Sequence, residues 1–267
     1  MILAWTVLAC SAILSARFLR DHWGDTKLCG VRIWFVIHRT VNTLTVLAFT
    51  GAFICIFFRE EWAWVGPQIG GTERENTSPP AIHATLGILA CCFGWVQPLN
   101  ALLRCKPNGT YRIIYNFVHA LFGFSAWLLA AGAIMVAILY FTPMPIFSDP
   151  ALAKALYIAY LAIVAFAFFN LEVLRIRKNW LKSVFNPRNP KPSNGIAPDK
   201  FDHTTVLGAP QQNNFVDAAV AKAENATDAA LAIKFKGINA LQSVILVVCL
   251  TFAFACTLSI CVLIAIR

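Results

Sequence analysis

Charged residues are scarce in this sequence. Lys, Arg, Asp and Glu make up 13% of its 267 residues, whereas 58% are apolar, and the mean hydropathy is +0.65. Soluble domains carry about twice that share of charge. The apolar residues fall in blocks whose length approaches the ~20 residues that cross a bilayer. An ordinary soluble domain is therefore excluded, and the sequence predicts a multi-pass membrane protein.

Several motifs are also missing. The chain has no CxxC pair and no Cys/His spacing typical of zinc. None of its nine cysteines lies in a predicted outside loop, so no disulfide framework is expected. No aromatic–basic motif occurs away from the membrane-flanking segments, so no nucleic acid is expected as a partner. The first block lacks the positive leader and cleavage site of a signal peptide.

What is present is a set of six apolar blocks, each interpreted as a transmembrane helix. They are Met1–Ala16, Ile33–Phe58, Ile82–Leu103, Ile113–Phe141, Leu152–Leu174 and Asn239–Ile266. The first block is short for a membrane span. We therefore expect the sequence to begin partway along a helix, with the first helix truncated.

The basic residues predict the orientation of these helices. If the first block runs inward, every Lys and Arg lies on the inside except Arg59, Arg74, Lys154 and Arg267. Such an excess marks cytosolic loops, so the net charge of +9 follows from topology. Residues 175–238 are predicted to be cytosolic and largely disordered, because "NPRNPKPSNGIAPDK" is rich in Pro, Asn and Gly. An Ala-rich helix is expected within the same loop.

Three histidines lie inside predicted spans, where an ionisable residue is costly and suggests a function. His38 and His119 follow the start of two outward-running helices by five or six residues. At 1.5 Å per residue both imidazoles lie about 8 Å below the cytosolic boundary. Two neutral imidazoles at one level can supply both axial ligands of a haem iron. His83 lies near the opposite face.

Two other interpretations of these histidines remain open. One is a haem-free scaffold or receptor-like membrane protein, in which the imidazoles form hydrogen bonds between helices. The other is a proton-coupled transporter, in which they relay protons. His22 and His203 are expected to be ordinary loop residues.

Short motifs around the histidines occur in a fixed order. The chain contains Trp34-Phe35-x-x-His38, then His83-x-x-x-Gly87 with Gln97-Pro98 and Arg104, and finally Asn116-x-x-His119-x-x-x-Gly123. Before them stand Met1-Ile-Leu-Ala4-Trp5 and Ala16-Arg17. In order and spacing these motifs resemble the cytochrome b561 transmembrane core. The similar branch carries an extracellular DOMON module and includes animal ferric-chelate reductases.

The resemblance implies an all-α membrane protein, a six-helix transmembrane bundle of cytochrome b561 type. Its haem-binding core would span residues 1–174, followed by the cytosolic loop 175–238 and a final helix at residues 239–267. His38 and His119 would bind one haem b. His83 would serve a second haem, whose other ligand in the family falls four residues upstream of Met1. The given chain is thus expected to hold one complete haem site, with the modules that precede the family's core absent from it.

The function implied by the resemblance is electron transfer across a membrane, which makes the chain a candidate oxidoreductase. Ascorbate would be the cytosolic donor, and a ferric chelate or monodehydroascorbate the external acceptor. Arg39, Arg104, Lys106 and Arg112 could meet haem propionates or the anionic donor, or could be ordinary cytosolic loop charge. Expected partners are membrane lipid and a second copy in a homodimer. The expected location is the plasma membrane or an endomembrane.

Overall fold

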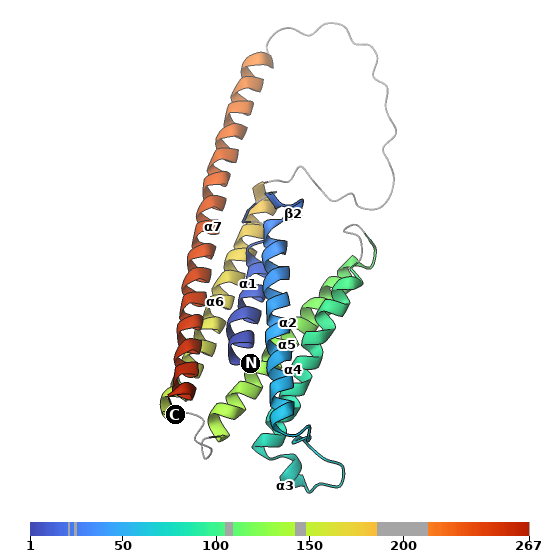
Figure 1. Ribbon diagram of the computed structural model, residues 1–267. Coiled ribbons are helices and arrows are strands. Elements are labelled where there is room, and N and C mark those ends of the chain that lie inside the picture. The colour runs from blue at the N-terminus through green and yellow to red at the C-terminus, as the bar shows by residue number, and fades with distance from the viewer. Residues whose placement is uncertain (21, 24–25, 105–108, 142–147, 186–212, 267) are drawn as a thin grey trace. The chain divides into compact units, whose positions relative to one another are not determined.

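A computed structural model describes residues 1–20, 22–23, 26–104, 109–141, 148–185 and 213–266, and these are largely helical (Figure 1). The elements in chain order are the π-helix η1 (Ala4–Ala9), α1 (Cys10–Phe18), β1 (Lys27–Leu28), β2 (Val31–Arg32), α2 (Ile33–Arg59), α3 (Glu73–Asn76), α4 (Pro79–Leu102), α5 (Arg112–Tyr140), α6 (Pro150–Phe185) and α7 (Asn213–Ala265). The predicted all-α fold class is confirmed.

Five helices of the described chain are long and apolar enough to cross a membrane. Their spans are Ile33–Arg59, Pro79–Leu102, Arg112–Tyr140, Pro150–Val184 and Ala229–Ala265. The remaining apolar helix, Ala4–Phe18, is shorter. Five of the six predicted spans are therefore long enough, and the predicted number of six is not established.

Local sequence signals explain where several elements begin. Pro79 and Pro80 open α4, where the missing N–H of proline leaves no hydrogen bond unmade. Thr72 and Glu75 form a reciprocal capping box at the start of α3. Cys29 and Gly30 both have positive φ, at 49° and 78°, and this favours a tight two-residue hairpin. The hairpin joins β1 to β2 and links α1 to α2.

The chain divides into two compact units, Met1–Phe169 with Val244–Arg267, and Asn170–Ser243. In the first unit Trp5 of η1 stacks on Phe49 of α2, with ring centroids 4.9 Å apart. Both side chains are buried. Gly94 of α4 lies directly against these rings, because a Cβ there would stand 2.8 Å from Phe49 and 3.2 Å from Trp5. A glycine therefore permits the close approach of α4 to this pair.

The π-helix η1 is fastened to the later helices by polar side chains. The Tyr160 hydroxyl of α6 donates to the Thr6 carbonyl at 3.0 Å. The Thr6 hydroxyl also lies 2.9 Å from that of Thr257 in α7. A widened helical turn leaves carbonyl groups available to such partners. These buried hydrogen bonds fix η1 against α6 and α7 within the first unit.

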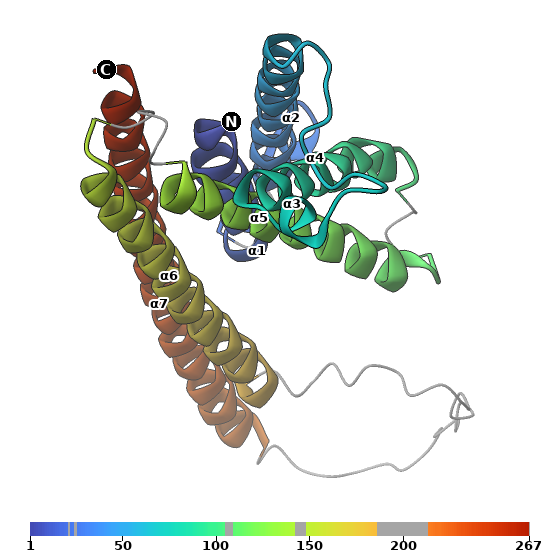
Figure 2. The same cartoon turned by 90° about the horizontal axis from the view of Figure 1, so that it is seen from below.

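Helices α4 and α5 run antiparallel and side by side (Figures 1 and 2). Three contacts set their register: His83 with the Ala133 carbonyl, Phe93 with Phe122, and Gln97 with His119. The phenyl rings stack 5.2 Å apart at an interplanar angle of 4°. This register places His83 and His119 at opposite ends of one helix pair.

The second unit contains the end of α6 and the adjoining part of α7. Lys178 is buried there, and its ammonium group donates to the Asn239 side-chain oxygen at 2.8 Å. Helix α6 continues to Phe185, beyond the apolar block predicted to end at Leu174. The predicted Ala-rich helix falls within α7, whereas residues 186–212 of the predicted loop lie outside the described residues.

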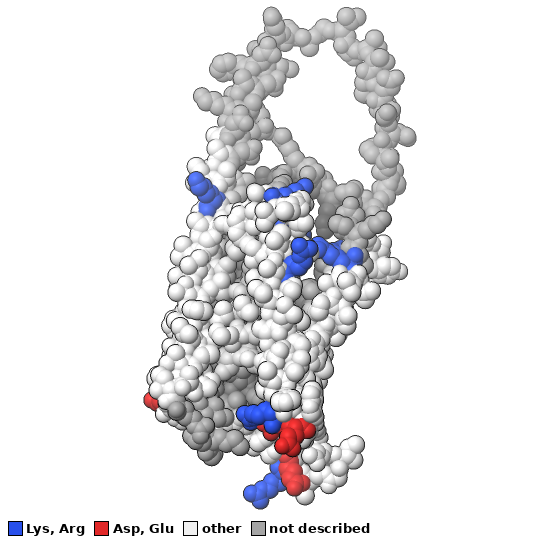
Figure 3. Space-filling model, viewed as in Figure 1, with Lys and Arg blue, Asp and Glu red and all other residues white. Residues whose placement is uncertain are grey.

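The charged side chains of the first unit differ between its two ends. Figure 3 shows acidic side chains gathered at the end that carries α3, together with a few basic ones. Basic side chains lie near the opposite end, where α2 begins. This separation follows the loops of the sequence, since Glu60, Glu61, Glu73 and Glu75 all fall between α2 and α4.

Candidate haem site

The structure brings His38 and His119 together, although they come from different helices 81 positions apart in the chain. Their ring centroids are 6.2 Å apart, and the ring planes lie at 75°. His38 is in the second turn of α2, and His119 is in the second turn of α5. The two histidines that depth and helix direction predict to be a pair thus lie close together, and their role as ligands stays a prediction.

This separation fits two axial ligands on one metal. An imidazole nitrogen binds a metal ion at about 2 Å, so two imidazoles on opposite sides of one iron have centroids about 6 Å apart. The described residues contain no cluster of three or more His, Cys, Asp and Glu. Two axial imidazoles do not need such a cluster, because the macrocycle supplies the other four nitrogens. The residues present thus fit a bis-histidine haem.

The second nitrogen of His38 is oriented by a neighbouring helix. His38 Nδ1 lies 3.1 Å from the Ala12 carbonyl oxygen of α1. A carbonyl can only accept, so this contact favours the tautomer in which Nδ1 carries the proton and Nε2 keeps a lone pair. Hydrogen bonds of this kind commonly fix the tautomer of metal-binding histidines. The Asn42 amide, one turn later in α2, lies over the same ring, 3.1 Å from Nδ1.

Two buried N–H donors have no acceptor among the described residues: Trp34 Nε1 and Asn100 Nδ2. Trp34 lies one turn before His38 in α2, and Asn100 lies one turn after Gln97 in α4. Trp34 is thus on the same helix face as His38, and Asn100 is on the same face as Gln97, which contacts His119. Buried polar groups are normally paired. These donors suit a carboxylate ligand, such as a haem propionate.

Three arginines lie at the end of the helices that carries His38 and His119. Arg104 stacks over Phe35 at 4.2 Å, Arg20 over Trp34 at 5.5 Å and Arg112 over Tyr115 at 5.2 Å. Partial burial lowers the pKa of Arg104, and the positive charge of Arg112 acts in the same direction. In the described chain no acidic side chain lies within ion-pair distance of Arg104. This crowding of positive charge favours an anion.

His83 lies at the other end of the α4–α5 pair. Its Nδ1 is 2.8 Å from the Ala133 carbonyl oxygen, and its ring lies 5.1 Å from that of Phe141. A cavity of about 100 Å³ opens beside His83, between α2, α4 and the loop that follows α2, and Glu60, Trp64 and Gly87 also line it. Gln97 marks the level of His119 on α4. Fourteen residues therefore separate the two histidine levels by about 21 Å.

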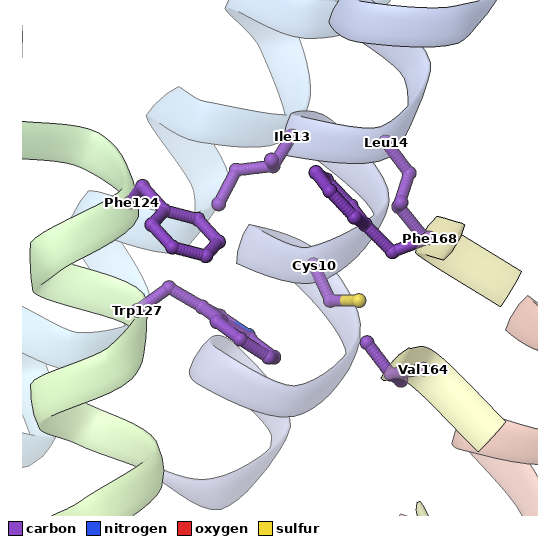
Figure 4. A pocket seen from close by; sticks show the side chains of 7 residues that line it. All are labelled: Cys10, Ile13, Leu14, Phe124, Trp127, Val164 and Phe168. Atoms are coloured by element: carbon purple, nitrogen blue, oxygen red, sulfur yellow. The ribbon is translucent and has the colours of Figure 1, made fainter. Parts of the chain in front are cut away.

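A narrow apolar cleft lies elsewhere in the first unit. Figure 4 shows Cys10 and Leu14 of α1 facing Trp127 of α5 and Phe168 of α6 around a narrow cleft. Its volume is about 20 Å³, and apolar side chains make up its lining apart from the Cys10 thiol. The cleft is too small for a macrocycle and contains no histidine. It is a packing defect between helices, away from the candidate site.

Comparison with known proteins gives matches over about half of the chain. Human ferric-chelate reductase 1 is 29% identical over 140 residues, which cover 51% of this chain and 21% of that protein. The mouse protein of the same name is 26% identical over 137 residues. A cytochrome b561, DM13 and DOMON domain-containing protein of Arabidopsis thaliana is 28% identical over 141 residues, or 13% of its length.

The chain resembles the cytochrome b561 core of ferric-chelate reductases. With five span-length helices, it is an integral, multi-pass membrane protein. No protein-family model and no solved structure matches it. The matched region spans about a fifth of the length of the ferric-chelate reductases. The b561 relationship implies haem b as the cofactor, and the ligand residues remain predictions.

The other candidate residues from the sequence differ in their distance from the histidine pair and in their exposure. Arg104 and Arg112 stand beside the histidine pair, whereas Arg39 and Asn116 are exposed. Lys106 lies outside the described residues. The histidine motifs alone did not reveal the roles of Trp34, Asn42, Gln97 and Asn100. Trp34 and Gln97 stand in the motifs of the sequence analysis, and helical spacing puts Trp34 and Asn42 one turn on either side of His38.

Proposed function

We propose that the chain transfers electrons across a membrane through haem b held between His38 and His119. The 6.2 Å separation of the two rings is the observation that carries the proposal. A haem bound there supplies a one-electron carrier. His38 and His119 would hold it, while α2 and α5 keep both imidazoles at one level. The similarity to ferric-chelate reductase 1 and to a cytochrome b561 protein supports the same chemistry.

The residues around the histidine pair have two further proposed roles, which are to bind carboxylates and to attract the electron donor. Trp34 and Asn100 would donate to haem carboxylates at the edge of the site, and Arg104 adds a positive charge that would attract an anionic reductant. Ascorbate, from the side where the loops are basic, is the proposed donor. On the opposite side, the proposed acceptor is a ferric chelate or monodehydroascorbate.

His83 marks the level at which a second haem would shorten the route. The two histidine levels are about 21 Å apart along α4 at the rise of an α-helix. The cavity beside His83 is smaller than a haem, and its lining includes no other histidine among the described residues. We propose that efficient transfer needs a second axial ligand at this end, as in the family's four-histidine arrangement.

Haem binding is tested on the full chain, purified from membranes of cells supplied with haem. We expect a Soret band and a low-spin, six-coordinate spectrum. His38→Ala and His119→Ala should each abolish that spectrum, because each removes one of two axial bonds. His83→Ala should change it little, and His22→Ala serves as the control in a loop. Equal, undiminished haem in all four variants would exclude histidine ligation and favour the packing interpretation.

Electron transfer is tested separately in sealed vesicles that contain the haem-loaded chain, with ascorbate inside and ferric citrate outside. We expect external ferrous iron to form in wild-type vesicles faster than in His38→Ala vesicles. A pH-dependent proton flux in a colourless protein would instead support the transporter interpretation.

A further inference from the structure

Two of the three intramembrane histidines have their Nδ1 atoms fixed by backbone. His38 Nδ1 faces the Ala12 carbonyl at 3.1 Å, and His83 Nδ1 faces the Ala133 carbonyl at 2.8 Å. A backbone carbonyl has no proton to give, so this contact favours the Nδ1–H tautomer. The Asn42 amide nitrogen also lies 3.1 Å from His38 Nδ1, but it donates to the His38 carbonyl at 2.8 Å. In the Nδ1–H tautomer Nε2 presents its lone pair, which is the form that a metal ion requires.

His119 differs, because its Nδ1 faces a side chain that can either donate or accept. One end of the Gln97 carboxamide lies 2.7 Å from His119 Nδ1, and the other end lies 2.8 Å from the Gly123 amide nitrogen. With the amide NH₂ toward the ring and the oxygen toward Gly123, all three contacts of the carboxamide are satisfied. Nδ1 then accepts, and a neutral imidazole must carry its proton on Nε2.

Iron ligation requires the opposite arrangement. If the Gln97 oxygen faces Nδ1, the ring donates Nδ1–H to it and Nε2 is left with its lone pair. A half-turn of the carboxamide interconverts the two states. It also turns the NH₂ group toward the Gly123 N–H and the oxygen toward the His119 carbonyl, so this second state gives up both backbone hydrogen bonds and needs the bond from Nε2 to iron to offset them. The carboxamide lies directly beside Gly123, because three of its atoms lie 3.7–3.8 Å from the point where a Gly123 Cβ would stand.

We propose that Gln97 is a positioning residue that selects the tautomer of His119 and thereby controls whether Nε2 can bind the haem iron. The inference rests on the proposed function, in which His119 is an axial ligand. Without haem, the carboxamide NH₂ faces the ring. When haem is loaded, the carboxamide oxygen turns to the ring and accepts Nδ1–H. That hydrogen bond makes His119 a stronger electron donor to iron.

Two substitutions separate this role from simple packing. Gln97→Met keeps a similar volume but forms no strong hydrogen bond with the ring. We expect its haem affinity to fall about 10-fold or more and the midpoint potential of the bound haem to rise, because the axial imidazole donates less charge. Gln97→Glu can only accept when ionised, so the low-spin spectrum should persist with a lower midpoint potential.

The matched control is Thr50→Val. It removes a different hydrogen bond between α2 and α4, in which Trp95 Nε1 donates to the Thr50 hydroxyl at 2.8 Å. That bond touches none of the three histidines, so the midpoint potential should stay at the wild-type value. The measurement is a redox titration of the purified full chain, followed by its visible spectrum.

Opposite shifts in Gln97→Met and Gln97→Glu, with no shift in Thr50→Val, would support the inference. Because methionine is neutral, its shift cannot come from an added charge. If haem binds normally and the Met variant keeps both wild-type affinity and wild-type potential, the inference is wrong while the proposed function stands. A wild-type chain that binds no haem would overturn both.

Discussion

Gly94 offers a sharp test of how the centre of the first unit packs. Changing Gly94 to Ala adds one methyl group, whose carbon would stand 2.8 Å from Phe49 Cζ, 3.1 Å from Phe49 Cε1 and 3.2 Å from Trp5 Cη2. The two rings are buried and stack on each other. Neither ring can turn away without losing that stack, so α4 must move away from α2 and η1.

The size of the effect follows from two opposing contributions. Overpacking a well-packed core costs about 1–3 kcal/mol, whereas replacing glycine by alanine inside a helix returns up to about 1 kcal/mol. We therefore expect Gly94→Ala to lower the free energy of unfolding by up to about 2 kcal/mol. Gly51→Ala in α2 is the matched control, because nothing lies within 4 Å of the Cβ it would add. That variant should be unchanged or slightly more stable.

The assay is thermal unfolding of the purified protein in detergent, followed by circular dichroism of its helices. A second variant, Phe49→Leu, makes room for the new methyl group. The double variant Gly94→Ala/Phe49→Leu should be less destabilised than the sum of its two single changes, which is the sign of direct contact. Equal melting temperatures for Gly94→Ala and Gly51→Ala would refute the packing described here.

Two further predictions concern the loops. In sealed right-side-out vesicles, protease added outside should leave residues 175–236 intact, because their ten Lys and Arg favour the cytosol; digestion from outside would mean that the orientation is inverted. In the loop before α4, hydrogen bonds from the Thr72 amide and hydroxyl hold the pKa of Glu75 below its ordinary value of 4.5. Protection of the Thr72 amide against hydrogen exchange should therefore be complete above pH 4.5 and be lost as pH falls through the lowered pKa. Greater protection on acidification, or the same pH profile in Glu75→Gln, would contradict this.

The membrane-spanning character of the chain could be predicted from the sequence, because the cost of placing charge in lipid acts on each segment separately. The apolar blocks from Ile33, Ile82 and Ile113 match α2, α4 and α5 within three residues at each end. The end of a helix was harder to predict where the helix continues beyond its apolar block. Helix α6 continues past Leu174 to Phe185, because good helix formers follow the apolar block and backbone hydrogen bonds do not depend on the bilayer.

The closeness of His38 and His119 could also be predicted, because depth in the bilayer is a count of residues multiplied by a fixed rise. The residues around the pair could not. Gln97 reaches His119 only in one register of α4 against α5, and Gly94 is needed only because Trp5 and Phe49 stack beside it. Such contacts depend on how three or four helices rotate about their own axes. A single sequence gives the height of each side chain along its helix, but packing alone decides which neighbour it meets.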